Sequence, residues 1–110
     1  MKMDNEMMRD MKQARFRNNN AAVLRALNLL RIRYERLTDV KYALNNIEEQ
    51  EFLDCVNYLQ EAGYVQLRRI RTKEKALLAD WDYTELEGKL THKGIKILSG
   101  DEIDNSIGVI

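Results

Sequence analysis

Lysine and arginine side chains gather in two stretches of the chain. The segment 64–75 has five basic residues against one acidic residue, and the basic ones are Arg68, Arg69, Arg71, Lys73 and Lys75. A second group, near the N-terminus, includes Arg15 and Arg17. Clustered cations neutralise phosphates, and affinity for nucleic acids depends largely on that neutralisation. Both groups are therefore candidate DNA contacts, although they could equally offset acidic side chains within one protomer or across a dimer.

The stretch between these groups has the opposite charge. The exposed positions of the helix expected after residue 46 are mostly acidic, and they include Glu48, Glu49, Glu51, Asp54 and Glu61. Gln50 and Asn57 lie on the same side and carry the amides that read adenine in the major groove. Because carboxylates would oppose entry into a phosphate-lined groove, we favour a solvated helix face, or one that pairs with a partner's arginines, over base reading.

The residue types that support catalysis form no recognisable constellation. Cys55 is the single cysteine and His92 the single histidine, so the chain offers no set of metal ligands. Neither a glycine-rich phosphate loop nor a nucleophile beside a base stands out. We therefore expect no enzymatic activity, no metal and no cofactor, and we expect Cys55 to serve as a small apolar residue in the core.

Composition sets the outer bounds. The 110 residues suffice for one modest core, and 45% hydrophobic with 33% charged residues fit an ordinary globular domain. The net charge is zero, but basic and acidic blocks alternate along the chain. No apolar run approaches the roughly 18 residues that span a membrane, and no signal peptide is recognisable. We expect a soluble, cytoplasmic protein without membrane contact.

Helical spacing of apolar residues divides the chain near its N-terminus. Met7, Met11 and Ala14 indicate a helical arm over residues 1–17. The triplet Asn18–Asn20 then breaks the pattern and offers an N-cap for the next helix. We therefore expect the arm to be a separate unit from the domain that follows.

The segment 18–100 is expected to hold the folded domain. Its first helix begins at the asparagines and is followed by a short helix that Thr38 caps. A third helix starts with a capping box made by Asn46 and Glu49 and ends at Gly63, which suits a left-handed backbone. These three helices should supply most of the core.

Beyond the third helix, apolar and polar residues alternate one by one in two stretches, which predicts two strands. The segment 72–83 between them is long for a tight turn, so we expect a flexible loop or a short extra element there. A last helix begins at Thr91 and ends at Gly100. Residues 101–110 form a tail without a period.

The order helix, helix, helix, strand, strand, helix predicts a mainly helical α+β fold, a winged helix-turn-helix with an extra N-terminal arm. The stretches "LTD…ALNN", "VNYLQEAGYV" and "LTHKGIKIL" resemble landmarks of the winged-helix superfamily across residues 20–99. The ending "LTHKGIKILSGDEIDNSIGVI" is more narrowly similar to small winged-helix proteins of Mu-like phages and prophages, although the long wing departs from them. The resemblance implies a regulatory or packaging role at DNA.

Three partners follow as expectations. Double-stranded DNA is the leading one, contacted chiefly through the wing and the N-terminal arm. A second copy is the next, because Met7, Met11, Leu29 and Ile32 exceed what one core needs and could bury one another in a homodimer. Another phage protein is the third, if the fold has lost DNA binding and acts as a protein-interaction module, which is the alternative function.

Overall fold

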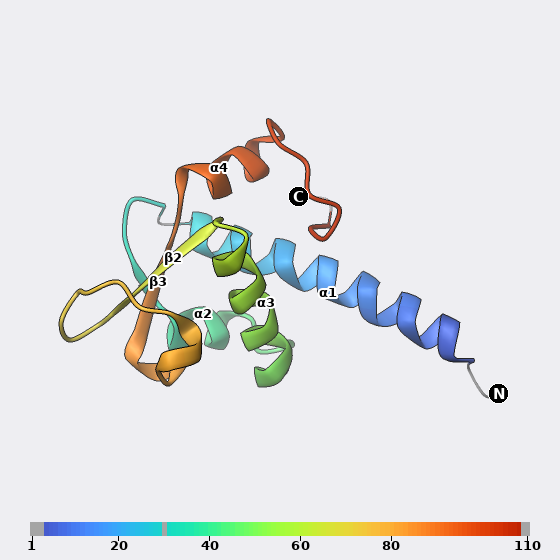
Figure 1. Ribbon diagram of the computed structural model, residues 1–110, viewed down its shortest axis with the longest axis horizontal. Helices are drawn as coiled ribbons and strands as arrows, with labels where there is room; N and C mark the ends of the chain where they lie inside the picture. Colours follow the sequence, from blue (N-terminus) through green and yellow to red (C-terminus); the bar gives the residue numbers. More distant parts are fainter. Residues whose placement is uncertain (1–3, 30, 109–110) are drawn as a thin grey trace.

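The computed structural model of the protein describes residues 4–29 and 31–108, which form four α-helices, a small sheet and two short 3₁₀ helices (Figure 1). The helices are α1 (Asn5–Asn28), α2 (Leu37–Ala43), α3 (Glu49–Glu61) and α4 (His92–Ser99). The strands are β1 (Glu35–Arg36), β2 (Val65–Arg69) and β3 (Leu86–Leu90). The expected α+β class, mainly helical with a small sheet, is confirmed. Among the described residues, no helix is long and apolar enough to cross a membrane.

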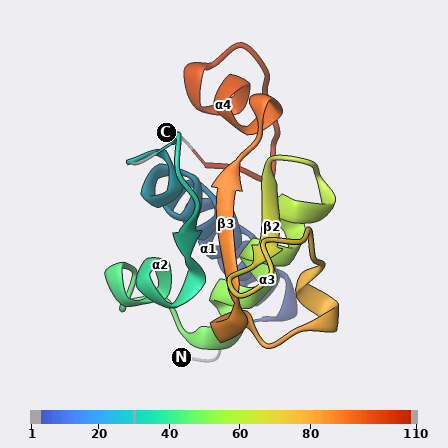
Figure 2. The same ribbon diagram turned by 90° about the vertical axis from the view of Figure 1, so that its left-hand side faces the viewer.

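The sheet has three antiparallel strands in the order β1-β3-β2, where the sequence predicted only two (Figure 2). The two-strand prediction is wrong because β1 contains two residues, too few to show an alternating pattern. Arg36 of β1 and Arg68 of β2 both pair with Glu87 of β3, so three charged residues form one row across the sheet. Helices α1 and α3 lie behind the sheet, and its other face is turned outward.

The core fills the space between these helices and the sheet. Its largest fully buried side chains include Leu24, Phe52, Leu59, Leu67 and Leu86. Cys55 is buried among them, as expected. Burial, followed by the charges of Asp54 and Glu51, raises the pKa of the Cys55 thiol to about 12. The thiol therefore stays protonated at neutral pH and acts as an apolar filler.

Helix α1 runs without a break through Asn18–Asn20, so the predicted break at these residues is wrong. Asparagine is unfavourable inside a helix because its side-chain amide competes for the hydrogen bonds of nearby backbone groups. Here two of the three side-chain amides instead bond to residues far along the chain. Asn19 Nδ2 donates to Glu51 Oε2 of α3 at 3.1 Å, and the fully buried Asn20 donates from Nδ2 to the Ser106 carbonyl at 2.9 Å. The boundary expected between residues 17 and 18 therefore falls inside one helix.

Two predicted helix starts are also wrong. Thr38 lies inside α2 rather than before it, and Asn46 lies in the turn before α3, whose N-cap position is Glu48. Leu37 and Ile47 are buried at these two entrances. Burying such a side chain is worth about 1.5–3 kcal/mol, whereas a cap is worth about 1 kcal/mol, so burial decides where each helix begins.

The predicted limits at Gly63, Thr91 and Gly100 are confirmed. Both of these glycines take the left-handed conformation with φ = 84°, which glycine adopts without strain. Thr91 is the N-cap of α4, and its Oγ1 accepts a hydrogen bond from the Gly94 N–H at 3.1 Å. A Cβ on Gly94 would overlap the Tyr64 carbonyl oxygen, so a glycine is needed for α4 to pack against the start of β2.

Residues 101–108 pack back onto the helices (Figure 1). The Asp104 carboxylate accepts hydrogen bonds from the hydroxyl of Tyr58 on α3 at 2.7 Å and from the hydroxyl of Tyr64, just before β2, at 2.6 Å. Together with the bond between Asn20 and the Ser106 carbonyl, these contacts tie the C-terminal segment to α1, to α3 and to the start of β2.

Replacing Asp104 by Asn should lower the free energy of unfolding by about 1–3 kcal/mol at neutral pH, because hydrogen bonds to a charged acceptor are lost. Burial acts to raise the pKa of Asp104, but the hydrogen bonds from Tyr64 and Tyr58 outweigh it and keep the pKa below its ordinary value. A lowered pKa stabilises the folded state above the unfolded-state pKa of about 4, and this stability is lost as pH falls through the folded-state pKa. Urea denaturation at neutral and at acid pH should show the difference between wild type and variant shrinking in acid.

The matched control is Asp101→Asn, which removes an exposed carboxylate from the same segment and should change stability little. An Asp104→Asn protein as stable as wild type at neutral pH would contradict the role given to this carboxylate.

Candidate nucleic-acid interface

The outer face of the sheet is organised around one buried carboxylate. Glu87 of β3 is 6% exposed, and its Oε1 accepts from Arg68 Nε at 2.6 Å and from Lys73 Nζ at 3.0 Å. The strand register adds Arg36 on the other side of Glu87. Burial acts to raise the pKa of Glu87, yet hydrogen bonds and charges from Lys73 and Arg68 outweigh it and lower the pKa. Glu87 is therefore ionised at neutral pH and holds two cations in fixed positions.

An aromatic ring covers the guanidinium of Arg68. Tyr34, just before β1, has its ring centroid 3.6 Å from Arg68 Cζ and 5.8 Å from Lys89 Nζ. A cation–π contact of this kind positions a cation without neutralising its charge. Tyr34 therefore connects the segment before β1 to both long strands and keeps their cations in a common arrangement.

Arg69 lies on the opposite side of β2 from Arg68, as strand alternation requires. Its Cζ is 3.8 Å from the ring centroid of Trp81, and its Nε is buried without a hydrogen-bond partner among the described residues. The Arg69 guanidinium thus serves first as a packing partner of Trp81 inside the wing, which is the connection between β2 and β3.

The wing is a folded part of the domain. It contains the short extra element that the sequence allowed for, in the form of two 3₁₀ helices, Leu78–Asp80 and Tyr83–Glu85. Gln60 of α3 fastens it at two points: Nε2 donates to the Ala76 carbonyl at 2.8 Å, and Oε1 accepts from the Leu78 N–H at 3.0 Å. One side chain of α3 therefore fixes the position of the wing against the helix.

The tip of the wing carries exposed cations. Arg71 and Lys75 are exposed, and neither has an ion-pair partner within the part of the chain that the structure describes. The backbone of Lys75 forms a bridge to Arg68, and the Ala76 N–H donates to the Leu67 carbonyl at 3.1 Å. Residues 74–76 of the wing thus run along β2 and hold the tip close to the sheet.

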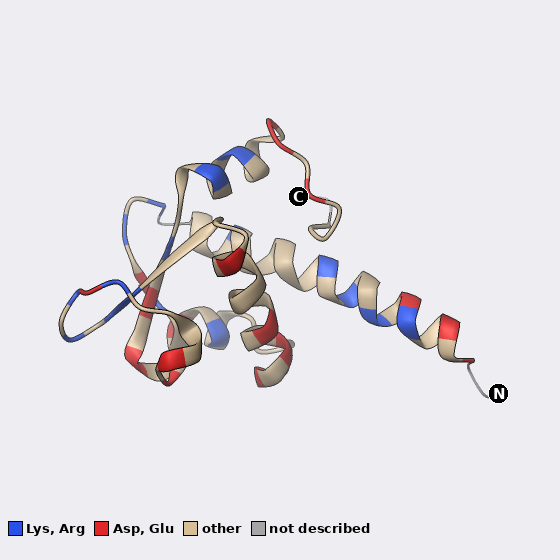
Figure 3. Cartoon of the chain, viewed as in Figure 1, with Lys and Arg blue, Asp and Glu red and all other residues tan. Residues whose placement is uncertain are grey.

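Four basic residues that the sequence reasoning left aside lie near this tip. Arg31, Arg33 and Arg36 are exposed between α1 and α2, and Lys89 lies on the outer face of β3. Figure 3 shows Lys and Arg from the turn before β1 and from the wing at the same end of the molecule, away from the N-terminus of α1. No local spacing could have found this group, because its segments are far apart in the sequence. We call this surface the cationic end, and its residues are Arg31, Arg33, Arg36, Arg68, Arg71, Lys73, Lys75 and Lys89.

The predicted arm residues lie elsewhere. Arg15 and Arg17 are exposed near the middle of α1, whose N-terminal end points away from the wing (Figure 3). Arg15 Nη1 forms an ion pair with Glu51 Oε1 of α3 at 3.1 Å, and the adjacent Phe16 packs edge-on against Tyr58 with ring centroids 5.4 Å apart. The structure therefore gives two separate basic surfaces, one on the arm and one at the cationic end.

The two candidate base-reading residues stand among carboxylates. Gln50, Asp54, Asn57 and Glu61 are all exposed and follow one another along one side of α3. Gln50 Nε2 donates to Asp54 Oδ1 at 2.9 Å, so its amide is already engaged. This side of the helix has no Lys or Arg that could neutralise DNA phosphates beside the two amides.

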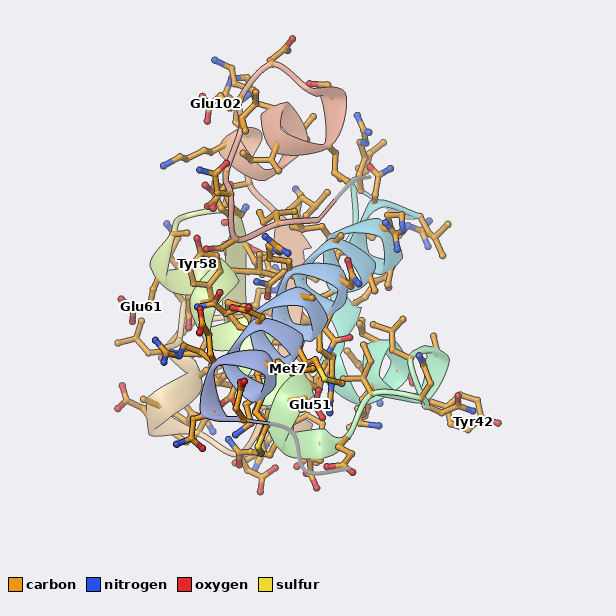
Figure 4. The ribbon with its side chains drawn as sticks, turned by 90° about the vertical axis from the view of Figure 1, so that its right-hand side faces the viewer. Met7, Tyr42, Glu51, Tyr58, Glu61 and Glu102 are labelled. Carbon is orange, nitrogen blue, oxygen red and sulfur yellow. The ribbon has the colours of Figure 1, made fainter. Side chains whose placement is uncertain are left out.

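The residues expected at a dimer interface are all exposed. Met7 and Met11 are each 51% exposed, Leu29 is 81% exposed and Ile32 is 85% exposed. Met7 lies near the free end of α1, and Tyr58 of α3 lies beside the same helix (Figure 4). Ile32 is in the turn after α1, whereas the other three belong to the helix or to its C-cap. The homodimer stays a prediction.

Neither a metal-ligand cluster nor a match to a known protein suggests a function for this surface. Among the described residues, no group of three or more His, Cys, Asp or Glu is placed to hold a metal ion. Comparisons of the chain with protein-family models, with curated proteins and with solved structures found no match.

Replacing Gln60 by Ala should loosen the wing, because the two hydrogen bonds that fasten Ala76 and Leu78 are lost. We expect the unfolding free energy to fall by about 1–3 kcal/mol and the Leu78 amide to exchange with solvent faster. Hydrogen-exchange NMR measures the exchange rates residue by residue. Gln66→Ala, a glutamine of β2, is the control and should leave the Leu78 rate unchanged. Equal exchange rates in wild type and Gln60→Ala would show that Gln60 does not fasten the wing.

Proposed function

We propose that the protein is a winged-helix protein that associates with double-stranded DNA through its cationic end, and that it is not an enzyme. The order of elements supports this fold, since α1, α2 and α3 precede a β2–β3 pair whose connection forms the wing. The resemblance of residues 90–110 to small proteins of Mu-like phages and prophages supports a phage or prophage context, in regulation or packaging.

One observation carries the proposal: cations from three distant segments, most of them exposed, meet at one end of a chain whose net charge is zero (Figure 3). Glu87 accepts from two of them, Arg68 and Lys73, but Arg71 and Lys75 have no ion-pair partner among the described residues. Segregated charge of this kind attracts a polyanion even when the total charge is zero. Duplex DNA presents the phosphate density that such a surface would neutralise.

The proposed contacts are to phosphates rather than to base edges. Phosphate contacts position a protein on DNA without reading its sequence. The residues of α3 that could read bases, Gln50 and Asn57, lie beside Asp54 and Glu61, whose charges would repel the backbone. The arm is a second and weaker contact in this proposal, because Arg15 is already paired with Glu51.

A protein-interaction module of the same fold is the second candidate. The exposed acidic side of α3 favours it, since a basic surface on another phage protein would complement Asp54 and Glu61. This candidate requires no DNA affinity, so a binding titration separates the two.

The double variant Arg71→Glu, Lys75→Glu should weaken binding of duplex DNA about tenfold or more at low salt, because two phosphate contacts become repulsive. It should also reduce the salt dependence by about one unit of slope for each cation, and to a similar degree for unrelated sequences. Fluorescence anisotropy with two duplexes of different sequence, at several salt concentrations, measures both effects.

The matched control is Arg9→Glu, Arg17→Glu, which makes the same change of charge on exposed positions of α1. It should weaken binding less than the wing variant does. If wild-type protein binds no duplex at low salt, DNA association is wrong and the interaction module takes its place.

Glu87→Gln should affect stability and DNA binding in opposite directions. Loss of the charged acceptor for Arg68 and Lys73 should lower the unfolding free energy by about 1–3 kcal/mol. The same change adds one positive charge to the cationic end, so duplex DNA should bind more tightly at low salt. Thermal unfolding and anisotropy on one preparation measure the two effects, and weaker DNA binding by the folded variant would contradict the proposed surface.

A further inference from the structure

One side of α1 is turned away from the core along the whole helix, except at Ala22, which packs partly against the core. Residues on this side recur at intervals of three or four, which keeps them on one helical face. They are Met7, Met11, Ala14, Asn18, Ala22, Arg25 and Leu29, and each is exposed or half-buried. The tail flanks this stripe at its centre, where Gly108 lies close to the Asn18 side chain.

The spacing of the stripe is symmetric about Asn18. Met7 and Leu29 are equally distant from it in the sequence, as are Met11 and Arg25, and Ala14 and Ala22. A second α1 running in the opposite direction, with Asn18 at the two-fold axis, would therefore meet the stripe residue for residue. The spacing of this face therefore matches itself under a two-fold axis, the commonest symmetry of oligomers.

We propose that two copies of the protein pair through this stripe, with their α1 helices antiparallel and crossing at Asn18. Met7 of each copy then packs on Leu29 of the other, and Met11 packs along the aliphatic stem of Arg25.

Ala14 faces Ala22 at the centre of the pair. These small side chains let the two helix axes approach closely. The Asn18 amides meet on the axis, where a polar pair fixes the register of packed helices.

The N-terminal part of α1 supplies a reason for this pairing. It extends beyond the rest of the domain (Figure 1), and Met7, Met8 and Met11 on it are 42–51% exposed. A few helical turns without tertiary packing are marginal in water. In the pair, this part of one copy lies along the C-terminal half of the other copy's α1, which the domain already holds in place. The inference does not depend on DNA association.

Sedimentation equilibrium tests the pair. Wild-type protein should show a mass near twice the 13.0 kDa of one chain, and Met11→Glu should raise the dissociation constant about tenfold or more. Met8→Glu is the control, because Met8 is similarly exposed on α1 but lies off the stripe. Circular dichroism checks that both variants stay folded, as expected for exposed positions. A wild-type mass of one chain at the highest concentration, or equal losses in the two variants, would overturn the proposal.

Spin labels test the direction of the helices independently. A label on Cys introduced by Met7→Cys should give an interspin distance of roughly 33 Å across the antiparallel pair, from the helical rise of 1.5 Å per residue. A label introduced by Asn18→Cys should report near contact, and the native Cys55 is buried and so stays unlabelled. Short distances at both positions would mean a parallel pair and would overturn the antiparallel arrangement.

Discussion

A carboxylate that is almost out of contact with water must have cationic partners, and this requirement shapes the outer face of the sheet. Glu87 forms ion pairs with Arg68 of the neighbouring strand and with Lys73 of the wing. One side chain therefore sets how two segments lie against β3. Lys73 reaches Glu87 from a backbone with φ = 64°, which costs a residue with a side chain some free energy. The ion pair offsets that cost, and the direction of the wing follows from it.

The charges of the chain are divided rather than mixed. Residues 37–63 contain one lysine and six acidic residues, whereas residues 64–75 contain five basic residues and one acidic residue. Some of these charges pair with one another inside the fold, as in the ion pair between Arg15 of α1 and Glu51 of α3. The rest remains at separate places on the surface, so the molecule has a marked electrostatic polarity although its net charge is zero. A surface of this kind discriminates between partners by orientation as much as by affinity.

Periodicity predicted the later helices and the two long strands, because a face that packs on a core repeats at regular intervals in the sequence. It failed at Asn18–Asn20, where the deciding partners are Glu51 and Ser106, far along the chain. It failed at β1 because two residues carry no period. Composition located the cations of the wing, but the contribution of residues 31–36 to the same surface depends on strand pairing and on the contact between Tyr34 and Arg68, which no local pattern encodes.

The wing also closes an edge of the sheet. As an outer strand, β2 would offer its free backbone groups to any extended chain that approached. The wing occupies this side, since the Arg69 N–H donates to the Glu74 carbonyl at 2.9 Å and the Ala76 N–H to the Leu67 carbonyl at 3.1 Å. The opposite outer strand, β1, is only two residues long and offers few free backbone groups to a strand of another molecule. Both outer edges of the sheet are therefore poor templates for edge-to-edge pairing with the sheet of a second molecule.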